Sequence, residues 1–306
     1  MIKTVLALQA VAFGILGVLA ADLYAHKRVE MVGGTNIWGY RGPVAKQRSD
    51  AEYRILLVGG TRAYGYGAAA DGTIAYALGW QLTGELLRPV NVINAAAMGA
   101  TAPDFAAIVA RYLALAPDLV CLYDDLGRAS LRRRESRVAR IARGYTPILP
   151  LVLEEKGMAW RYGSVARGYA GEPPTAGWPR RMAGAWLQWV GSSLSFLDSE
   201  MAPSSPDDYA PSILAAADAA LSVVPHVLVV VDPPIDNRTR NNLTELQAAL
   251  ASRAGSRISL LVVSDVGGPD TLLDGYSYNA VGRSRVEMAM RVELLKRLWY
   301  PPAPRQ

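Results

Sequence analysis

The sequence predicts an α/β fold in which helices cover both faces of a parallel sheet, with one apolar helix preceding it. Two observations lead to this prediction. From Tyr53 onward, short apolar runs alternate with helix-length segments, and the connections between them are short. This alternation implies right-handed crossovers and therefore parallel strands. Before Tyr53, the chain opens with a long and almost uninterrupted apolar segment, which is typical of a membrane helix.

The composition indicates a folded protein with a sizeable core. Of its 306 residues, 51% are hydrophobic and 19% are charged, which is too apolar a balance for a disordered chain. The net charge of +5 comes from local basic clusters, and no nucleic-acid-binding motif accompanies them, so we expect no nucleic-acid partner. The single cysteine, Cys121, excludes an internal disulfide and a thiolate metal cluster.

The N-terminal segment from Thr4 to Tyr24 is apolar apart from Gln9 and Asp22. At about 1.5 Å per residue it can cross a hydrocarbon core of about 30 Å. A cleaved signal peptide is the main alternative, because Lys3 gives a basic start and small residues end the run. We expect a transmembrane anchor over residues 1–28. Basic residues flank both of its ends, so the charge rule does not fix its orientation.

An irregular linker is expected over 29–52, a folded domain over 53–300 and a short tail over 301–306. Within the domain, buried strands are predicted at Ile55–Val58, Val90–Ile93, Leu119–Leu122, His226–Val231 and Ile258–Val263. Helices are predicted at Ile74–Leu87, Asp104–Leu115 and Val281–Leu298, and an alanine-rich helix precedes the fourth strand.

An insertion at about 129–211 interrupts this alternation with arginines, tryptophans and several proline and glycine breaks. A solvated helix face is the alternative interpretation of the arginine run. Arginine and tryptophan are enriched at protein interfaces, and tryptophan also at membrane borders, so we expect contacts with a protein surface or with anionic lipids. The predicted interaction residues are Arg132, Arg133, Arg134, Arg137, Arg140, Trp160, Trp178, Trp186 and Trp189.

Four blocks of the sequence resemble motifs of the SGNH (GDSL-like) hydrolase superfamily. A strand and turn of the family reads ILVLGGSTTFGYG, and later blocks read INAGVPGYT, PDVVVVYDGWND and DGYHYNAEGN. The corresponding blocks here are ILLVGGTRAYGYG (Ile55–Gly67), INAAAMGAT (Ile93–Thr101), PDLVCLYDDLGR (Pro117–Arg128) and LDGYSYNAVGRSR (Leu273–Arg285). The resemblance implies a flavodoxin-like three-layer α/β/α sandwich with a parallel sheet.

Carried over residue by residue, the resemblance implies a degenerate hydrolase site. Thr61 stands at the position of the nucleophilic serine and adds a methyl group beside the attacking oxygen. Gly99 matches the oxyanion-hole glycine, but Gly127 replaces an asparagine whose amide is typically worth about 10²–10³ in rate. Asp274 matches the catalytic aspartate, whereas Ser277 stands where the family has its histidine. Without an imidazole, no base near neutral pH is available to Thr61.

The other candidate groups do not restore the site. His26 lies in the membrane flank, and His226 begins a buried strand, where we interpret it as structural. Asp124 and Asp125 end a strand, but no further ligands are visible beside them, so we expect no metal. The glycine-rich turn lacks both the dinucleotide and the P-loop fingerprint, so we expect no cofactor. Four loop tyrosines, Tyr64, Tyr66, Tyr276 and Tyr278, are expected to converge over the vacated site.

The sequence therefore favours a non-catalytic SGNH-fold accessory or scaffolding subunit of a membrane protein assembly, such as a photosynthetic or respiratory complex. Its partners would be an integral membrane protein complex and membrane lipids. The alternative is an active membrane-anchored esterase or O-acyltransferase that acts on acylated glycans or lipids through Thr61. A ligand-binding module that uses the residual cleft is a third hypothesis. Single-anchor members of the superfamily usually face the extracytoplasmic side, so the resemblance implies a domain on the periplasmic side.

Overall fold

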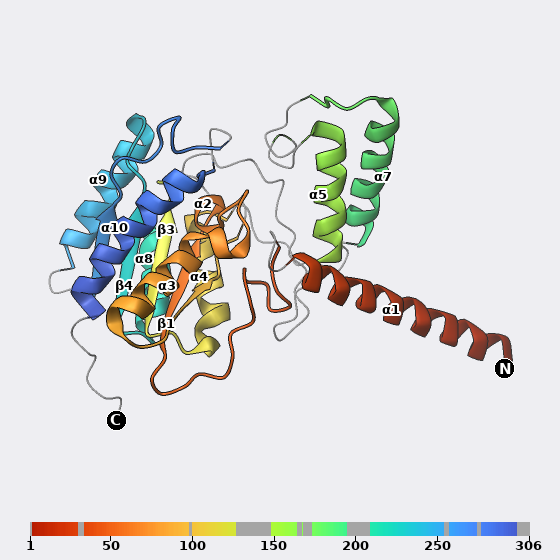
Figure 1. Ribbon diagram of the computed structural model, residues 1–306, viewed down its shortest axis with the longest axis horizontal. Coiled ribbons are helices and arrows are strands. Elements are labelled where there is room, and N and C mark those ends of the chain that lie inside the picture. Colours follow the sequence, from red (N-terminus) through yellow and green to blue (C-terminus); the bar gives the residue numbers. More distant parts are fainter. Residues whose placement is uncertain are drawn as a thin grey trace. The chain divides into compact units, whose positions relative to one another are not determined.

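The computed structural model describes residues 2–29, 34–97, 100–126, 148–163, 167, 173–194, 209–253, 257–273 and 277–298 (Figure 1). The chain divides into two units. The first consists of Met1–Gly39 and Arg137–Glu200, and the second of Tyr40–Ser136 and Met201–Gln306.

The second unit is built on a five-stranded parallel sheet with the order β2-β1-β3-β4-β5. This is the flavodoxin-like strand order, and it confirms the predicted fold class. Each predicted strand is present, with ends that differ from the prediction by two residues or fewer. The strands are β1 (Tyr53–Gly59), β2 (Val90–Asn94), β3 (Leu119–Asp124), β4 (His226–Val231) and β5 (Ile258–Val262).

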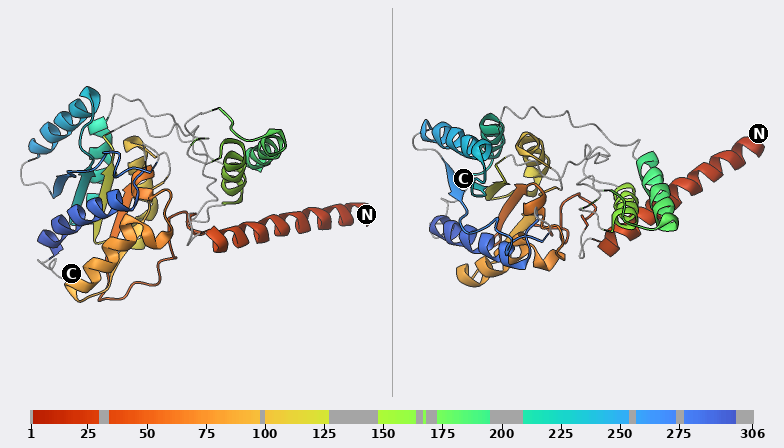
Figure 2. Two further views of the ribbon diagram at one scale, coloured as in Figure 1. Left: turned by 45° about the horizontal axis from the view of Figure 1, so that its top comes forward. Right: turned by 90° about the horizontal axis from the view of Figure 1, so that it is seen from above.

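Helices cover both faces of this sheet, as the view from above in Figure 2 shows. Helices α4, α8 and α9 share a buried apolar cluster with one face, while α3 and α10 lie together against the other. A very short helix, α2, follows β1. The bounds are α2 (Thr61–Tyr64), α3 (Ile74–Leu86), α4 (Ala102–Tyr112), α8 (Tyr209–Leu221), α9 (Asn237–Ala251) and α10 (Ala280–Leu298).

The helix predicted from Asp104 begins two residues earlier, because Thr101 and Asp104 form a capping box at its start. It ends at Tyr112, and a short 3-10 turn, Leu113–Leu115, takes up the remainder of the predicted span. The strands beneath are closed to solvent on both faces: every residue of β1 and of β3 is buried. Such strands are continuous apolar runs, which is why the sequence identified them.

The first unit contains α1 (Ile2–Val29), α5 (Leu149–Tyr162) and α7 (Trp178–Leu194). The sequence analysis did not identify α5 and α7, which lie in the predicted insertion and form an antiparallel pair (Figure 1). Their backbones approach closely through glycines. A Cβ built on Gly157 would lie 2.5 Å from the carbonyl oxygen of Gly184, and one on Gly191 would lie 2.7 Å from that of Pro150. The bounds predicted for the linker, domain and insertion stay predictions.

Helix α1 is long and apolar enough, from Lys3 to Arg28, to cross a membrane by length and composition. A signal sequence near an N-terminus has the same properties, so the helix alone does not separate an anchor from a signal. Its large apolar side chains are exposed along its length, among them Leu6, Phe13 and Leu16.

Asp22 links α1 to the helix pair. Its Oδ1 accepts hydrogen bonds from the backbone N–H groups of Ile148 (2.8 Å) and Leu149 (2.6 Å), so it caps the start of α5. The Nε2 atom of His26 lies 3.5 Å from Oδ2 of the same carboxylate, and its Nδ1 lies 2.8 Å from the carbonyl oxygen of Thr35. Asp22, which interrupts the apolar N-terminal segment, therefore makes a tertiary contact with the start of α5.

The substitution Gly184→Ala should destabilise the α5–α7 pair by about 1–3 kcal/mol, which is the usual cost of overpacking. The new Cβ would lie 2.6 Å from the carbonyl oxygen of Gly157 and 2.6 Å from Cγ of Arg161. Amide hydrogen exchange in the full chain measures this as lost protection in α5 and α7.

The matched control is Gly84→Ala in α3, where nothing lies within 4 Å of the added Cβ. Alanine there should stabilise by about 0.5–1 kcal/mol, because it restricts the unfolded chain and favours helix. Unchanged protection in Gly184→Ala would contradict the close backbone approach.

Candidate functional site

The candidate site is the carboxyl edge of the sheet between β1 and β3, where the strand order reverses. Open α/β sheets bind ligands at this point. β1 ends at Gly59, and Thr61 follows at the start of α2, so the predicted nucleophile position does lie in the turn after β1. The turn is tightly packed. A Cβ on Gly59 would lie 2.5 Å from the carbonyl oxygen of Tyr123, and one on Gly60 would lie 2.6 Å from that of Ala100.

A buried polar cluster centred on Asp232 closes this edge. Asp232 directly follows β4 and is fully buried. One of its carboxylate oxygens, Oδ1, accepts hydrogen bonds from the hydroxyl groups of Tyr123 (2.7 Å) and Tyr278 (2.5 Å), whose oxygens lie 3.1 Å apart. The other, Oδ2, forms an ion pair with the guanidinium of Arg62, which also lies over the ring of Tyr278 at 4.8 Å. We call these four residues the Asp232 cluster.

The Asp232 cluster uses the immediate neighbours of two predicted catalytic positions. Arg62 directly follows Thr61, and Tyr278 directly follows Ser277. Ser277, at the family's histidine position, is itself fully buried, and its carbonyl oxygen accepts a hydrogen bond from the N–H of Leu273 at 2.8 Å. The chain at these two positions is therefore fixed into the core of the second unit.

The charges in the cluster stabilise each other. Burial and the neighbouring carboxylate raise the pKa of Tyr123 and of Tyr278 above the ordinary tyrosine value. Burial lowers the pKa of Arg62, but the Asp232 carboxylate together with Tyr278, Tyr123 and Asp125 outweighs burial, so the pKa of Arg62 lies above its ordinary value. At neutral pH the cluster therefore holds a paired guanidinium and carboxylate with two protonated phenols, and neither phenol is ionised to act as a base.

The histidine of the sheet unit, His226, lies on the opposite edge from Thr61. His226 is the first residue of β4 and pairs in register with Leu119, the first residue of β3. Because the strands are parallel, His226 lies at the amino edge of the sheet, opposite the turn that carries Thr61. His26 belongs to the first unit, where it contacts Asp22 and Thr35. These are the only two histidines in the sequence.

The loop after α2 is held by Arg41, which lies in the segment predicted as a linker. Its guanidinium donates hydrogen bonds to the carbonyl oxygens of Tyr64 (2.6 Å), Gly65 (2.6 Å) and Ala68, and it stacks on the Tyr64 ring at 4.6 Å. Burial lowers the pKa of Arg41. Asn94, at the end of β2, adds a bond from Nδ2 to the carbonyl oxygen of Ala63 at 3.3 Å. The turn next to Thr61 is thus fixed from the adjacent edge strand as well.

Several predicted residues lie outside the described residues. These are Gly99, Gly127 and Asp274 of the site, Tyr276 of the converging tyrosines, and Arg132, Arg133, Arg134, Arg137 and Arg140 of the insertion. The predicted tryptophans are described: Trp160 on α5 is partly exposed, and Trp178, Trp186 and Trp189 on α7 are well exposed. Among the described residues, no group of three histidine, cysteine or acidic side chains is placed to hold a metal ion.

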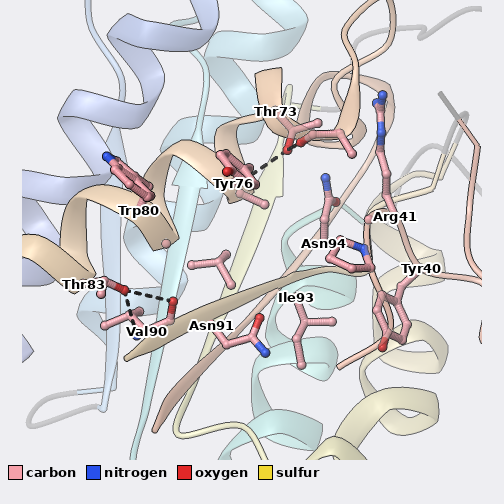
Figure 3. A pocket seen from close by; sticks show the side chains of 16 residues that line it. Tyr40, Arg41, Thr73, Tyr76, Trp80, Thr83, Val90, Asn91, Ile93 and Asn94 are labelled. Carbon is pink, nitrogen blue, oxygen red and sulfur yellow. Dashed lines mark hydrogen bonds between the residues drawn. The ribbon is translucent and has the colours of Figure 1, made fainter. Parts of the chain in front are cut away.

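A cavity of about 310 Å³ is lined by residues of α3, of β2 and of the segment from Tyr40 to Pro43. Figure 3 shows these side chains around it. Thr83 lies on its wall and accepts a hydrogen bond from the N–H of Val90 at 2.9 Å. The lining includes neither Thr61 nor Ser277, and Asp232 is absent from it too. This cavity is therefore separate from the predicted hydrolase site.

The sequence analysis missed Arg62, Asp232 and Arg41. Asp232 had a detectable signal, since it is a lone carboxylate directly after the apolar run of β4, at the edge where ligands bind. Its partner Arg62 lies 170 positions earlier in the chain, and no local pattern relates the two. Arg41 stands in a glycine-containing segment without periodicity, and nothing there indicates burial.

Comparison with protein-family models and with curated proteins finds no match. Among solved structures the chain is similar to TesA, with 15% identity, a TM-score of 0.47, and coverage of 80% of this chain and 99% of that one. It is also similar to the lipase/acylhydrolase from Enterococcus faecalis, with 16% identity, a TM-score of 0.43, and coverage of 83% and 99%. A G-D-S-L family protein from Desulfitobacterium hafniense aligns at 14% identity, a TM-score of 0.40, and coverage of 78% and 98%.

Replacing Asp232 by asparagine should destabilise the second unit by about 3–5 kcal/mol, because the buried Arg62 guanidinium loses its counter-charge. Equilibrium urea unfolding of the full chain in detergent measures the change. The matched control is Asp218→Asn, which breaks the exposed pair with Arg253 (2.6 Å) and should change the free energy by less than about 1 kcal/mol. The double variant Asp232→Asn with Arg62→Met should recover most of the lost free energy of unfolding. If Asp232→Asn alone is as stable as the wild type, the buried ion pair between Asp232 and Arg62 is contradicted.

The raised tyrosine pKa values predict alkaline sensitivity. Above about pH 10 the tyrosines of the unfolded chain lose their protons, while Tyr123 and Tyr278 keep theirs in the folded state. The contribution of these two tyrosines to the free energy of unfolding is therefore fully present below that pH. It is lost as the pH rises toward the raised pKa values of the folded state. Thermal unfolding followed from pH 7 to about pH 11 should show this fall. The fall of stability with pH should be shallower in Tyr278→Phe. The control is Tyr76→Phe on the exposed face of α3, which should leave this fall unchanged.

Proposed function

We propose that this chain is a non-catalytic SGNH-fold accessory or scaffolding subunit of a membrane protein assembly, held in the membrane by α1. The Asp232 cluster carries the proposal. It occupies the carboxyl edge of the sheet with a saturated ion pair, at the place where acyl transfer would need a nucleophile and a base. A fold can persist after its site has been lost, because folds and activities are separable.

The chemistry of the edge supports the absence of turnover. A hydroxyl nucleophile needs a base that accepts its proton, and in hydrolases of this type the base is an imidazole oriented by a carboxylate. Ser277 cannot serve as that base, and the Asp232 carboxylate already accepts two phenol hydrogen bonds and pairs with Arg62. Freeing that carboxylate for Thr61 would leave a buried guanidinium unpaired, at a cost of about 3–5 kcal/mol.

The exposure of α1 supports a membrane location. In the described structure its apolar side chains face outward along a helix of 28 residues, and an apolar surface of this extent needs lipid or protein around it. The exposed tryptophans of α7 belong to the same unit and offer a second contact surface. The resemblance to single-anchor members of the superfamily favours a sheet unit on the periplasmic side.

The proposal is tested by gentle purification of the tagged full chain from its native membranes. We expect companion proteins at a constant ratio to the chain through size exclusion and density-gradient steps. A solitary monomer in every mild detergent would contradict the scaffolding function.

An activity assay separates the proposal from the alternative, an esterase or O-acyltransferase that acts on acylated glycans or lipids. The purified chain should hydrolyse a short-chain aryl ester no faster than its Thr61→Ala variant. The matched control is Thr244→Ala, whose hydroxyl lies exposed on α9. Hydrolysis that disappears in Thr61→Ala and persists in Thr244→Ala would favour the esterase.

A further inference from the structure

One face of α7 carries a stripe of large apolar side chains. Trp178, Met182, Trp186 and Trp189 follow each other at spacings of four, four and three residues, which place them on one side of a helix. They are exposed by 68%, 54%, 61% and 66% of their surface, respectively. We call these four residues the tryptophan stripe.

The tryptophan stripe lies on the opposite side of α7 from the contact with α5. That contact is made by Gly184 and Gly191, whose backbones approach α5, and by Gln188, whose side chain accepts a hydrogen bond from Arg161. These three residues are also spaced by four and three, but they are displaced from the stripe by roughly half a helical turn. The helix pair is therefore complete without covering the tryptophans.

The helix pair is joined to the end of α1 by the two hydrogen bonds from the start of α5 to Asp22. Figures 1 and 2 show α7 on that side of α5 toward which α1 extends. If α1 crosses a bilayer, its Asp22 end lies at one border of the hydrocarbon core, and α7 lies beside that border. The outward face of α7 is then the face that meets lipid.

We propose that the tryptophan stripe of α7 lies in the interfacial layer of the bilayer that α1 crosses; this rests on the membrane attachment in the proposed function. Tryptophan rings prefer the headgroup level, where the apolar body and the N–H each find a suitable environment. Arg181 is exposed at the start of the helix, in the same turn as Trp178, and its long side chain can reach lipid phosphates. An amphipathic helix with such a face lies in the plane of the membrane surface.

The test uses the full chain in phosphatidylcholine and phosphatidylglycerol vesicles whose acyl chains are brominated, with unbrominated vesicles as reference. Bromine quenches the fluorescence of tryptophans that reach the bilayer. We expect strong quenching of the wild type and loss of most of it in the triple variant Trp178→Phe, Trp186→Phe and Trp189→Phe. The matched control is Trp80→Phe: this side chain is 71% exposed, lies on α3 of the other unit, and should contribute little.

Flotation of the vesicles separates the two proposals. If the chain floats with the vesicles and the triple variant keeps the quenching, the stripe is not in lipid and this inference is wrong. If the chain does not float, the membrane attachment fails together with the inference. Loss of companion proteins in the triple variant, with quenching unchanged, would make the stripe a protein interface instead. Circular dichroism checks that the triple variant is folded. If it is not, the single variant Trp189→Phe replaces it, and a partial loss of the quenching is expected.

Discussion

The second unit depends on the burial of one carboxylate, that of Asp232. A charge without solvent is stable only with a counter-charge and hydrogen-bond donors, and here these come from three different segments. Arg62 comes from the turn after β1, Tyr123 from β3, and Tyr278 from the loop before α10. The same carboxylate thus fixes the chain around both Thr61 and Ser277. An edge that is open to ligands in other sheets of this type is used here to hold segments together.

The sheet could be predicted because its central strands β1 and β3 are buried at every residue, and all five strands are apolar runs between turn residues. The helices α5 and α7 were missed for the opposite reason. Their mutual contact uses glycines such as Gly157 and Gly184, which give no hydrophobic signal, while the large side chains of α7 point away from that contact. A periodicity analysis assumes that apolar residues face the core, and in α7 they do not.

The position of Thr61 could also be predicted, because the motif around it is local. The residues that surround Thr61 could not be predicted, because the residues with which they form contacts are distant in the chain. Arg62 and Asp232 are 170 positions apart, and Asp22 caps a helix that begins more than a hundred residues later. In the sequence Asp22 is a polar break in an apolar segment, and only the tertiary contact gives it a role. Long-range polar pairs of this kind leave no pattern in one sequence.

Arg41 has a mechanical consequence. The chain leaves the first unit at Gly39 and enters the second at Tyr40, so tension on α1 along the chain would enter the sheet unit here, at the first of three crossings between the units. The Arg41 side chain, two residues into this unit, donates hydrogen bonds to the backbone carbonyls of Tyr64, Gly65 and Ala68, in the segment that follows Thr61. Several bonds loaded together resist a pull better than bonds loaded one after another. The turn that carries Thr61 is therefore held next to one of the places where the chain enters the sheet unit.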